Sequence, residues 1–146
     1  PLPEAGIVLP KSSLLGGLAI NKDACTLCMS CVSSCPEGAL LDNPDEPILS
    51  FIEKQCVQCG ICVQTCPEKA LALSPRLLTV EQRKQRVELN ETKPFHCISC
   101  GKVFGTSKMI DLMLIKLGAH GAFAGAALDR LKMCSDCRVV DMVNKE

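Results

Sequence analysis

Twelve cysteines in a chain of 146 residues constrain this sequence more than any other feature, because all of them fall in short-spaced groups. Two groups of four share the spacing C-x2-C-x2-C-x3-C-P, and the remaining four cysteines form two C-x2-C pairs. No cysteine is left over for a long-range disulfide. With no Trp, no Tyr and only four Phe, a large aromatic core is excluded. Something other than packing is therefore expected to hold the fold together.

The two four-cysteine groups are copies of one repeat with an offset of 31 residues. The sequence Cys-Pro-Glu-Gly-Ala-Leu at 35–40 returns as Cys-Pro-Glu-Lys-Ala-Leu at 66–71. Three cysteines at i, i+3 and i+6 are poorly spaced for disulfides, and zinc usually takes separate C-x2-C pairs. The spacing therefore favours iron-sulfur clusters over zinc or disulfides.

Over about residues 18–73 the sequence closely resembles a bacterial-type ferredoxin with two 4Fe-4S clusters. The resemblance implies an α+β fold, a ferredoxin-like pseudo-twofold β-α-β repeat around the two clusters. It also implies crossed ligation, in which the cysteine before each proline completes the cluster of the other motif. Cluster one would be held by Cys25, Cys28, Cys31 and Cys66, and cluster two by Cys56, Cys59, Cys62 and Cys35.

Short apolar runs beside the motifs support this fold independently. Residues 18–20 and 49–51 predict a strand before each motif, and residues 39–41 and 70–73 predict a strand after each one. A turn is expected at 43–47, where Asn, Pro and Asp gather.

One position differs between the two motifs in a way that bears on chemistry. The first motif has Met29 where the second has Gly60. Glycine lets the backbone approach a cluster, whereas methionine adds apolar bulk and restricts φ. We therefore expect the two clusters to differ in potential. The alternative is that Met29 only fills a gap in a small core.

The remainder of the chain predicts three further segments. Residues 1–17 are interpreted as a linker or extension, and residues 74–96 as a charged linker with a short helix. Thr79 and Gln82 have the spacing of a capping box for that helix. Residues 97–146 are expected to form a small, mainly helical, four-cysteine metal-binding module.

The last four cysteines, Cys97, Cys100, Cys134 and Cys137, indicate a tetrahedral site with four thiolates. Zinc is the favoured metal, and a rubredoxin-like single iron fits the same ligands. Residues 93–104 also resemble the opening of a Cys-Cys-His-His zinc finger. The positions of its leucine and two histidines hold Ile110, Met113 and Leu117, so a DNA-binding finger cannot close.

Two helices are expected between these cysteine pairs. Thr106 or Ser107 would cap the first, which ends at Gly118. The second would use Phe123, Ala127, Leu128 and Leu131, with Gly121 and Gly125 allowing the helices to approach closely. Packing around the metal is favoured over the alternative of a docking surface.

His96 and His120 are expected to be surface or loop residues with a backbone partner rather than ligands.

Charge and motif content exclude several functions. The net charge is zero, with 16 basic and 16 acidic residues, which gives no overall field to attract nucleic acid. Residues 18–73 are acidic, with three basic and seven acidic side chains. A membrane span is not expected, because uncharged runs are short and interrupted by glycine. The chain lacks an initiator methionine, and we expect it to be processed or part of a longer protein.

The sequence shows no nucleophile and base pair and no phosphate-binding loop, so it predicts an electron carrier or relay rather than an enzyme. We expect a cytoplasmic module of a larger redox protein or complex. The alternative is an assembly or scaffold protein with structural clusters and a client-binding tail. Residues 94–102 and 133–138 resemble the C-terminal region of bacterial 4Fe-4S proteins associated with molybdenum-type formate dehydrogenase systems, which implies partners of that kind.

Overall fold

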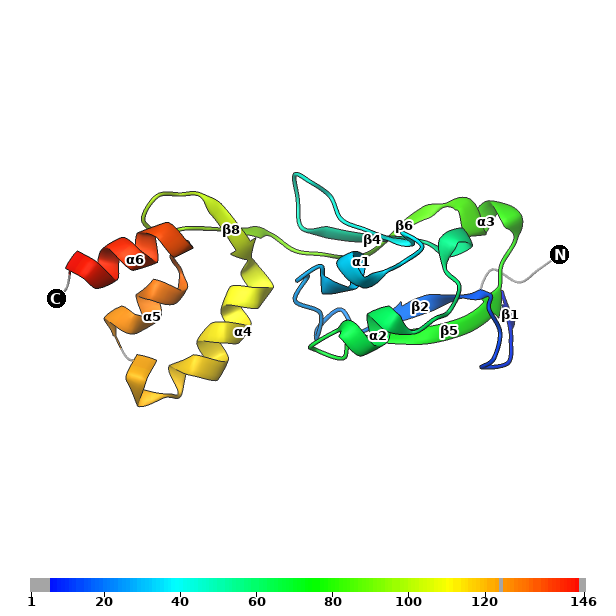
Figure 1. Cartoon of the computed structure of the whole chain (residues 1–146), viewed down its shortest axis with the longest axis horizontal. Helices are drawn as coiled ribbons and strands as arrows, with labels where there is room; N and C mark the ends of the chain where they lie inside the picture. The colour runs from blue at the N-terminus through cyan, green and yellow to red at the C-terminus, as the bar shows by residue number, and fades with distance from the viewer. Residues whose placement is uncertain (1–5, 124, 145–146) are drawn as a thin grey trace. The chain divides into compact units, whose positions relative to one another are not determined.

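The chain forms two compact units in a computed structural model that describes residues 6–123 and 125–144 (Figure 1). Unit one extends to Glu91, and unit two begins at Thr92. Because each unit has its own sheets and helices, each is described by itself.

Unit one contains two antiparallel three-stranded sheets with the strand orders β1-β5-β2 and β3-β4-β6. The strands are β1 (Ile7–Val8), β2 (Gly16–Ile20), β3 (Leu40–Leu41), β4 (Ile48–Ile52), β5 (Leu71–Leu77) and β6 (Arg86–Glu91). The four strands predicted beside the motifs are confirmed as β2, β3, β4 and β5. The pseudo-twofold relation between the halves stays a prediction.

The described part of unit one contains four short helical elements, two of which, α1 and α2, lie within the cysteine motifs. They are α1 (Ser30–Ser34), the 3-10 turn η1 (Glu53–Gln55), α2 (Ile61–Thr65) and α3 (Val80–Lys84). Helices α1 and α2 lie side by side (Figure 1). Each is too short to be stable alone, so tertiary contacts must hold it in place.

The core of unit one is small and includes cysteines. Phe51, Leu40 and Leu49 are almost completely buried, and Leu40 lies opposite Phe51 in the β3-β4 pair. The same buried cluster contains Cys25, Cys31 and Cys62 together with other aliphatic residues. The aliphatic core and the motif sulfurs are therefore continuous.

The segment interpreted as a linker belongs in large part to unit one. The predicted helix is α3, and its capping box is present: the Gln82 amide donates to Thr79 Oγ1 at 3.2 Å, and the Thr79 amide donates to Gln82 Oε1 at 3.2 Å. Residues 74–77, however, continue β5, and residues 86–91 form β6, which pairs with β4. Leu89 and Asn90 are buried there, although the charged residues around them suggested exposure.

The predicted extension over 1–17 also contributes to the sheet. Ile7 and Val8 pair with Leu77 and Arg76, and Gly16 and Gly17 begin β2. Residues 1–5 of that extension lie outside the described residues. The first sheet therefore includes residues from the segment that the sequence indicated as an extension.

Unit two combines one hairpin with helices. Its elements are β7 (Pro94–His96), β8 (Val103–Thr106), α4 (Ser107–Gly118), the 3-10 turn η2 (Gly121–Phe123), α5 (Ala126–Leu131) and α6 (Ser135–Asn144). The first predicted helix is confirmed as α4, since Thr106 Oγ1 accepts from the Met109 amide at 3.2 Å. Phe95 and Phe104 pack edge to face, with ring centroids 5.8 Å apart.

The second predicted helix is confirmed in part as α5, which contains Ala127, Leu128 and Leu131. It begins only at Ala126, after Phe123, whose side chain lies outside the described residues. A Cβ built on Gly121 or Gly125 meets no described atom within 4 Å, so these glycines do not provide a close helix approach. Gly125 instead adopts φ +63°, a conformation that favours glycine.

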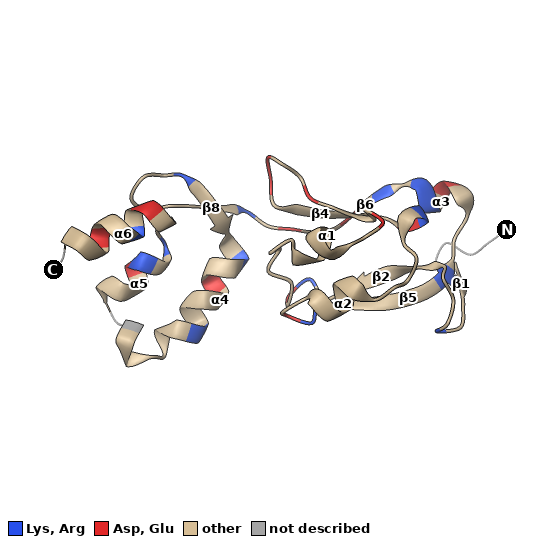
Figure 2. Cartoon of the chain, in the orientation of Figure 1, with Lys and Arg blue, Asp and Glu red and all other residues tan. Residues whose placement is uncertain are grey.

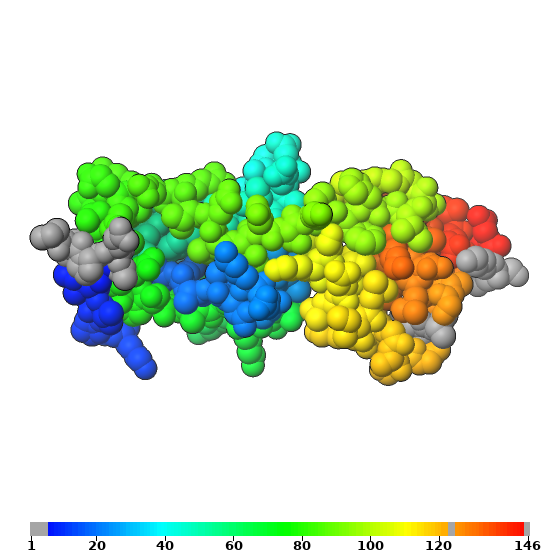
Figure 3. Space-filling view, turned by 180° about the vertical axis from the view of Figure 1, so that it is seen from behind, coloured from blue at the N-terminus to red at the C-terminus, as the bar shows by residue number. Residues whose placement is uncertain are grey.

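Charged residues are unevenly spread over unit one. Lys and Arg gather over α3 and the start of β6, and acidic residues lie on the turn between β3 and β4 (Figure 2). That turn projects from the surface of the unit (Figure 3), and the Asp45 amide donates to Asn43 Oδ1 within it at 2.9 Å. Among the described residues, no helix is long and apolar enough to cross a membrane.

Replacing Gly16 by alanine should destabilise unit one by about 1–3 kcal/mol. The added Cβ would lie 2.6 Å from the Ser74 carbonyl oxygen and 2.7 Å from Pro75 Cα, so β2 and β5 would have to separate. Urea unfolding followed by far-ultraviolet circular dichroism measures the loss. The control is Ala19→Ser, at an exposed position of the same strand, which should stay within about 0.5 kcal/mol. Equal stability of the Gly16 variant and the wild type would contradict this close strand contact.

Candidate metal centres

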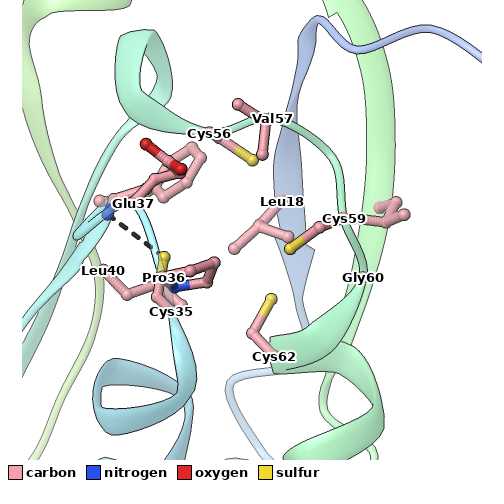
Figure 4. A pocket seen from close by; sticks show the side chains of 13 residues that line it. Leu18, Cys35, Pro36, Glu37, Leu40, Cys56, Val57, Cys59, Gly60 and Cys62 are labelled. Atoms are coloured by element: carbon pink, nitrogen blue, oxygen red, sulfur yellow. Dashed lines mark hydrogen bonds between the residues drawn. The ribbon is translucent and has the colours of Figure 1, made fainter.

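Two cavities in unit one each gather four cysteines from both motifs. Cavity one is lined by Cys25, Cys28, Cys31 and Cys66, together with apolar side chains that include Leu49 and Leu71. Cavity two is lined by Cys56, Cys59, Cys62 and Cys35, together with Leu18, Leu40 and Phe51. Figure 4 shows the four sulfurs of cavity two turned toward a common space. These groups of cysteines are the ones named in the crossed assignment, and the binding of clusters by them stays a prediction.

The repeat is visible in the backbone as well as in the sequence. Positive φ angles occur at Leu27 (54°) and Gln58 (57°), which are equivalent residues of the two motifs. The same holds for Met29 (62°) and Gly60 (76°), each directly before a helix. Met29 therefore accepts a left-handed conformation that glycine adopts freely, at a cost of order 1–3 kcal/mol. The loop shape is thus kept even where the residue type does not favour it.

Each cavity has one sulfur that accepts a backbone hydrogen bond at an equivalent place. The Ala39 amide donates to Cys35 Sγ at 3.3 Å, as drawn in Figure 4, and the Ala70 amide donates to Cys66 Sγ at 3.4 Å. Both acceptors are the cysteines before proline. Such donors stabilise thiolate charge and orient the sulfur toward its site.

Burial makes the inner thiols of both cavities hard to ionise. In cavity one, burial is the main cause that raises the pKa of Cys31 to about 12, and the charges of Cys25 and Cys28 add to it. In cavity two, burial is the main cause that raises the pKa of Cys62 to about 11, and the charge of Cys56 adds to it. A bound cation would reverse this preference, because metal binding replaces the thiol protons.

Unit two gathers the four remaining cysteines into a third candidate centre, which we call the tail site. It consists of Cys97, Cys100, Cys134 and Cys137, whose sulfurs all lie within 4.8 Å of one another. Cys97 and Cys100 lie in the loop between β7 and β8, where the Cys97 amide donates to the Lys102 carbonyl at 2.8 Å. Cys134 directly precedes α6, and Cys137 lies in its first turn.

Sulfur spacing separates the tail site from the two cavities. Four thiolates around one zinc or iron ion lie about 3.8 Å apart, given tetrahedral bonds of about 2.3 Å. Cys100 Sγ and Cys134 Sγ are 3.7 Å apart, which fits a single ion. Within the described part of the chain, the cysteines of the two cavities form no comparably tight group of three or more. Wider spacing suits a multi-iron cluster, in which each thiolate binds a different iron.

Hydrogen bonds prepare the tail site for an ion. Burial raises the pKa of the Cys97 thiol, but backbone N–H groups, first those of Cys100 and Cys134, outweigh burial and lower it to about 6. Hydrogen bonds from its thiol, first to Cys100 and then to Cys134, raise the pKa of Cys137 to about 12. The four sulfurs thus share protons that a divalent ion would displace.

Helices α5 and α6 are held together beside the tail site. Arg130 Nε donates to Asp141 Oδ2 at 2.8 Å, and Arg138 Nε donates to the Arg130 carbonyl at 3.0 Å. Arg138 also donates to the Met133 carbonyl, next to Cys134, at 3.1 Å. The loop carrying Cys134 is therefore positioned by α6, an element that the sequence analysis did not predict.

The two histidines are not among the clustered ligands of the described residues. His96 is exposed, and its Nδ1 lies 3.1 Å from the Gly101 carbonyl, so its predicted backbone partner is confirmed. His120 is exposed at the end of the loop after α4.

Sequence reasoning missed the polar group beside cavity two. Gln58 Nε2 donates to Cys56 Sγ at 3.3 Å and to the Gly17 carbonyl at 2.9 Å. Next to it, Arg76 donates to the buried carboxylate of Glu53 through Nη2 at 2.7 Å and through Nε at 2.9 Å. A Gln between two cysteines carries no recognisable signal, because the strand that it contacts lies 41 residues earlier.

Comparison with known families gives two matches. Both families are described as a 4Fe-4S dicluster domain, and they match residues 24–71 and residues 55–103. The first match covers all eight cysteines of the two cavities, and the second overlaps it at the second motif and continues to Cys97 and Cys100. No curated protein matches the chain. The chain therefore carries a ferredoxin-type 4Fe-4S dicluster region, followed by a four-cysteine group that is suited to a metal ion.

Proposed function

We propose that this chain relays single electrons through two 4Fe-4S clusters, as a cytoplasmic module of a larger redox protein or complex. The observation that carries the proposal is the pair of cavities, each with four cysteine sulfurs and apolar walls. Clusters held by thiolates provide one-electron chemistry at potentials set by their surroundings. The dicluster family matches support the same reading.

The residues around each cavity suit electron entry and exit. Cys28 in cavity one and Cys59 in cavity two are exposed, whereas Cys31 and Cys62 are buried. The exposed cysteines give a partner a point of close approach, and aliphatic side chains exclude water from the inner sulfurs. Slow access of water and oxidants protects a cluster, while the exposed thiolate shortens the path for an electron.

Crossed ligation is the assignment that we propose for the eight cysteines. Cavity one takes its fourth sulfur from Cys66 and cavity two takes its fourth from Cys35, so each cluster would join the two motifs. Each cluster would then link the loop and short helix of one motif to the residue that ends the helix of the other motif. Binding of clusters and folding of unit one should be strongly coupled.

The partners are proposed from charge and from the resemblance described above. Glu37 lines cavity two and Glu68 lines cavity one, so a partner with a basic docking face is favoured. A formate dehydrogenase-type system is the proposed setting. Ionic strength should then weaken association, because exposed charges are screened by salt.

A reversible redox cycle tests the relay function. Anaerobic protein reduced with dithionite and reoxidised should recover its visible and EPR spectra with its iron content unchanged, over several cycles. The scaffold alternative requires no such reversibility. If the clusters lose iron at each reduction, the relay proposal is wrong and a structural role is favoured.

Substitution of the cysteine before each proline by serine tests crossed ligation. Cys66→Ser should damage mainly the cluster held by Cys25, Cys28 and Cys31, and Cys35→Ser should damage mainly the other one. Resonance Raman and EPR spectra of the two variants should therefore show complementary losses. If each variant instead loses the signal of the cluster held by the other three cysteines of the substituted motif, each motif closes its own cluster.

For the tail site we propose a zinc ion, with a single iron as the alternative metal. Zinc has no accessible one-electron couple, so it would hold shape, with about 10 kcal/mol or more of binding free energy available for folding. That role suits unit two, where Cys97, Ile110 and Cys134 are the buried hydrophobic residues among those described.

Replacing Cys134 and Cys137 together by serine should unfold unit two and leave both cluster EPR signals nearly unchanged. Limited proteolysis, metal analysis and EPR on the same sample measure this. The control is Val139→Ser with Val143→Ser, two exposed positions of α6, which should leave unit two protected. An iron-type redox signal from the tail site, or loss of the cluster signals in the cysteine variant, would contradict the proposal.

A further inference from the structure

The two cavities differ most clearly at one pair of equivalent positions. In the second motif the residue between the first two cysteines and directly before Cys59 is Gln58, and in the first motif it is Leu27. Both have nearly the same positive φ, 57° and 54°. Leu27 is buried and apolar, whereas Gln58 places an amide group beside a cysteine sulfur. The two motifs therefore share the loop conformation but differ in the polarity of the side chain at this position.

The amide of Gln58 is fixed by two acceptors. Its Nε2 group donates to the Gly17 carbonyl at 2.9 Å and to Cys56 Sγ at 3.3 Å, which uses both of its hydrogens. Its Oε1 is buried with no hydrogen-bond partner among the described residues. Because the opposite orientation would place this oxygen against two acceptors, the N–H toward sulfur is the only satisfactory arrangement.

The strand beside Gln58 is shaped to receive it. A Cβ on Gly16 would lie 2.8 Å from Gln58 Cδ, so an alanine there would collide with the amide. A Cβ on Gly17 would collide with the Glu53 carboxylate, which is paired with Arg76. The two glycines of β2 thus make room for polar side chains on the side of cavity two.

Cavity one has a weaker counterpart. Ser30 Oγ lies 3.3 Å from Cys28 Sγ, but this contact is exposed, and water can replace the hydroxyl. The backbone donors at Ala39 and Ala70 are equivalent in the two cavities and so favour neither. Gln58 supplies cavity two with a part-buried side-chain N–H donor to a cysteine sulfur.

We propose that Gln58 is a positioning residue that raises the potential of the cluster in cavity two above that of the cluster in cavity one. The inference rests on the proposed electron-relay function and adds the order in which the two clusters are reduced: the first electron to enter the pair resides at cavity two. A donor to a thiolate sulfur stabilises the reduced state more than the oxidised one, because reduction adds one negative charge. Removal of this part-buried N–H should therefore favour oxidation of that cluster.

The variant Gln58→Leu tests this directly, because Leu27 shows that leucine fits the same backbone conformation in this chain. EPR-monitored redox titration of the anaerobic protein should give two waves in the wild type. In the variant the upper wave should fall, so that the electron distribution between the clusters changes by about tenfold, which corresponds to about 59 mV for one electron. The controls are Gln64→Leu, an exposed glutamine of α2, and Ser30→Ala, which should leave the upper wave unchanged.

If Gln58→Leu instead lowers the potential of the lower wave, the order of the two potentials is the reverse of that proposed. If neither wave moves relative to Gln64→Leu, Gln58 has no effect on potential and the inference is wrong. Gln58→Met, which keeps an unbranched side chain without the donor, is the second variant if Gln58→Leu fails to incorporate iron. A wild type with one cluster or none would refute the proposed function itself, which iron analysis of the same sample distinguishes.

Discussion

The fold of unit one depends on bringing cysteine sulfurs from two halves of the chain to the same place. Its aliphatic core is small, with Phe51, Leu40 and Leu49 the largest side chains that are almost completely buried. Three motif cysteines belong to that same core, and burial raises the pKa of two of them, Cys31 and Cys62. Without a bound cation, these thiols are buried in the neutral, protonated form. With a cluster in each cavity, the same burial would hold the two halves together and exclude water.

Sulfur spacing then decides what each group of cysteines can hold. The tail site brings its sulfurs within 4.8 Å of one another, which suits one tetrahedral ion. Among the described residues, the cavity cysteines form no comparably tight group, and apolar side chains line both cavities, which suits a cluster of several irons. The two units therefore carry two different kinds of candidate metal centre, one in the dicluster region and one in the four-cysteine group.

The cysteine pattern allowed both groups of candidate ligands to be predicted, because metal ligation demands particular residues at particular spacings. The strands beside the motifs were also predictable, since Leu49 and Phe51 mark a buried strand in a short apolar run. Strand β6 was not, because it is an edge strand in which Leu89 is surrounded by charged residues and its partner is β4, far away in the sequence. Gln58 and Arg76 were missed for the same reason: their roles depend on Gly17 and Glu53, which only the folded chain brings near. Gly121 and Gly125 were misread because glycine spacing alone does not distinguish a close approach from a turn.

Iron and sulfide analysis with Mössbauer spectroscopy of anaerobically prepared, iron-57-labelled protein tests the central claim most directly. The account predicts eight irons and eight sulfides per chain in two cubane-type environments, with any further metal confined to a single tetrahedral thiolate site. Four irons and four sulfides or fewer in fully loaded protein, or iron present only as isolated tetrahedral ions, would contradict it.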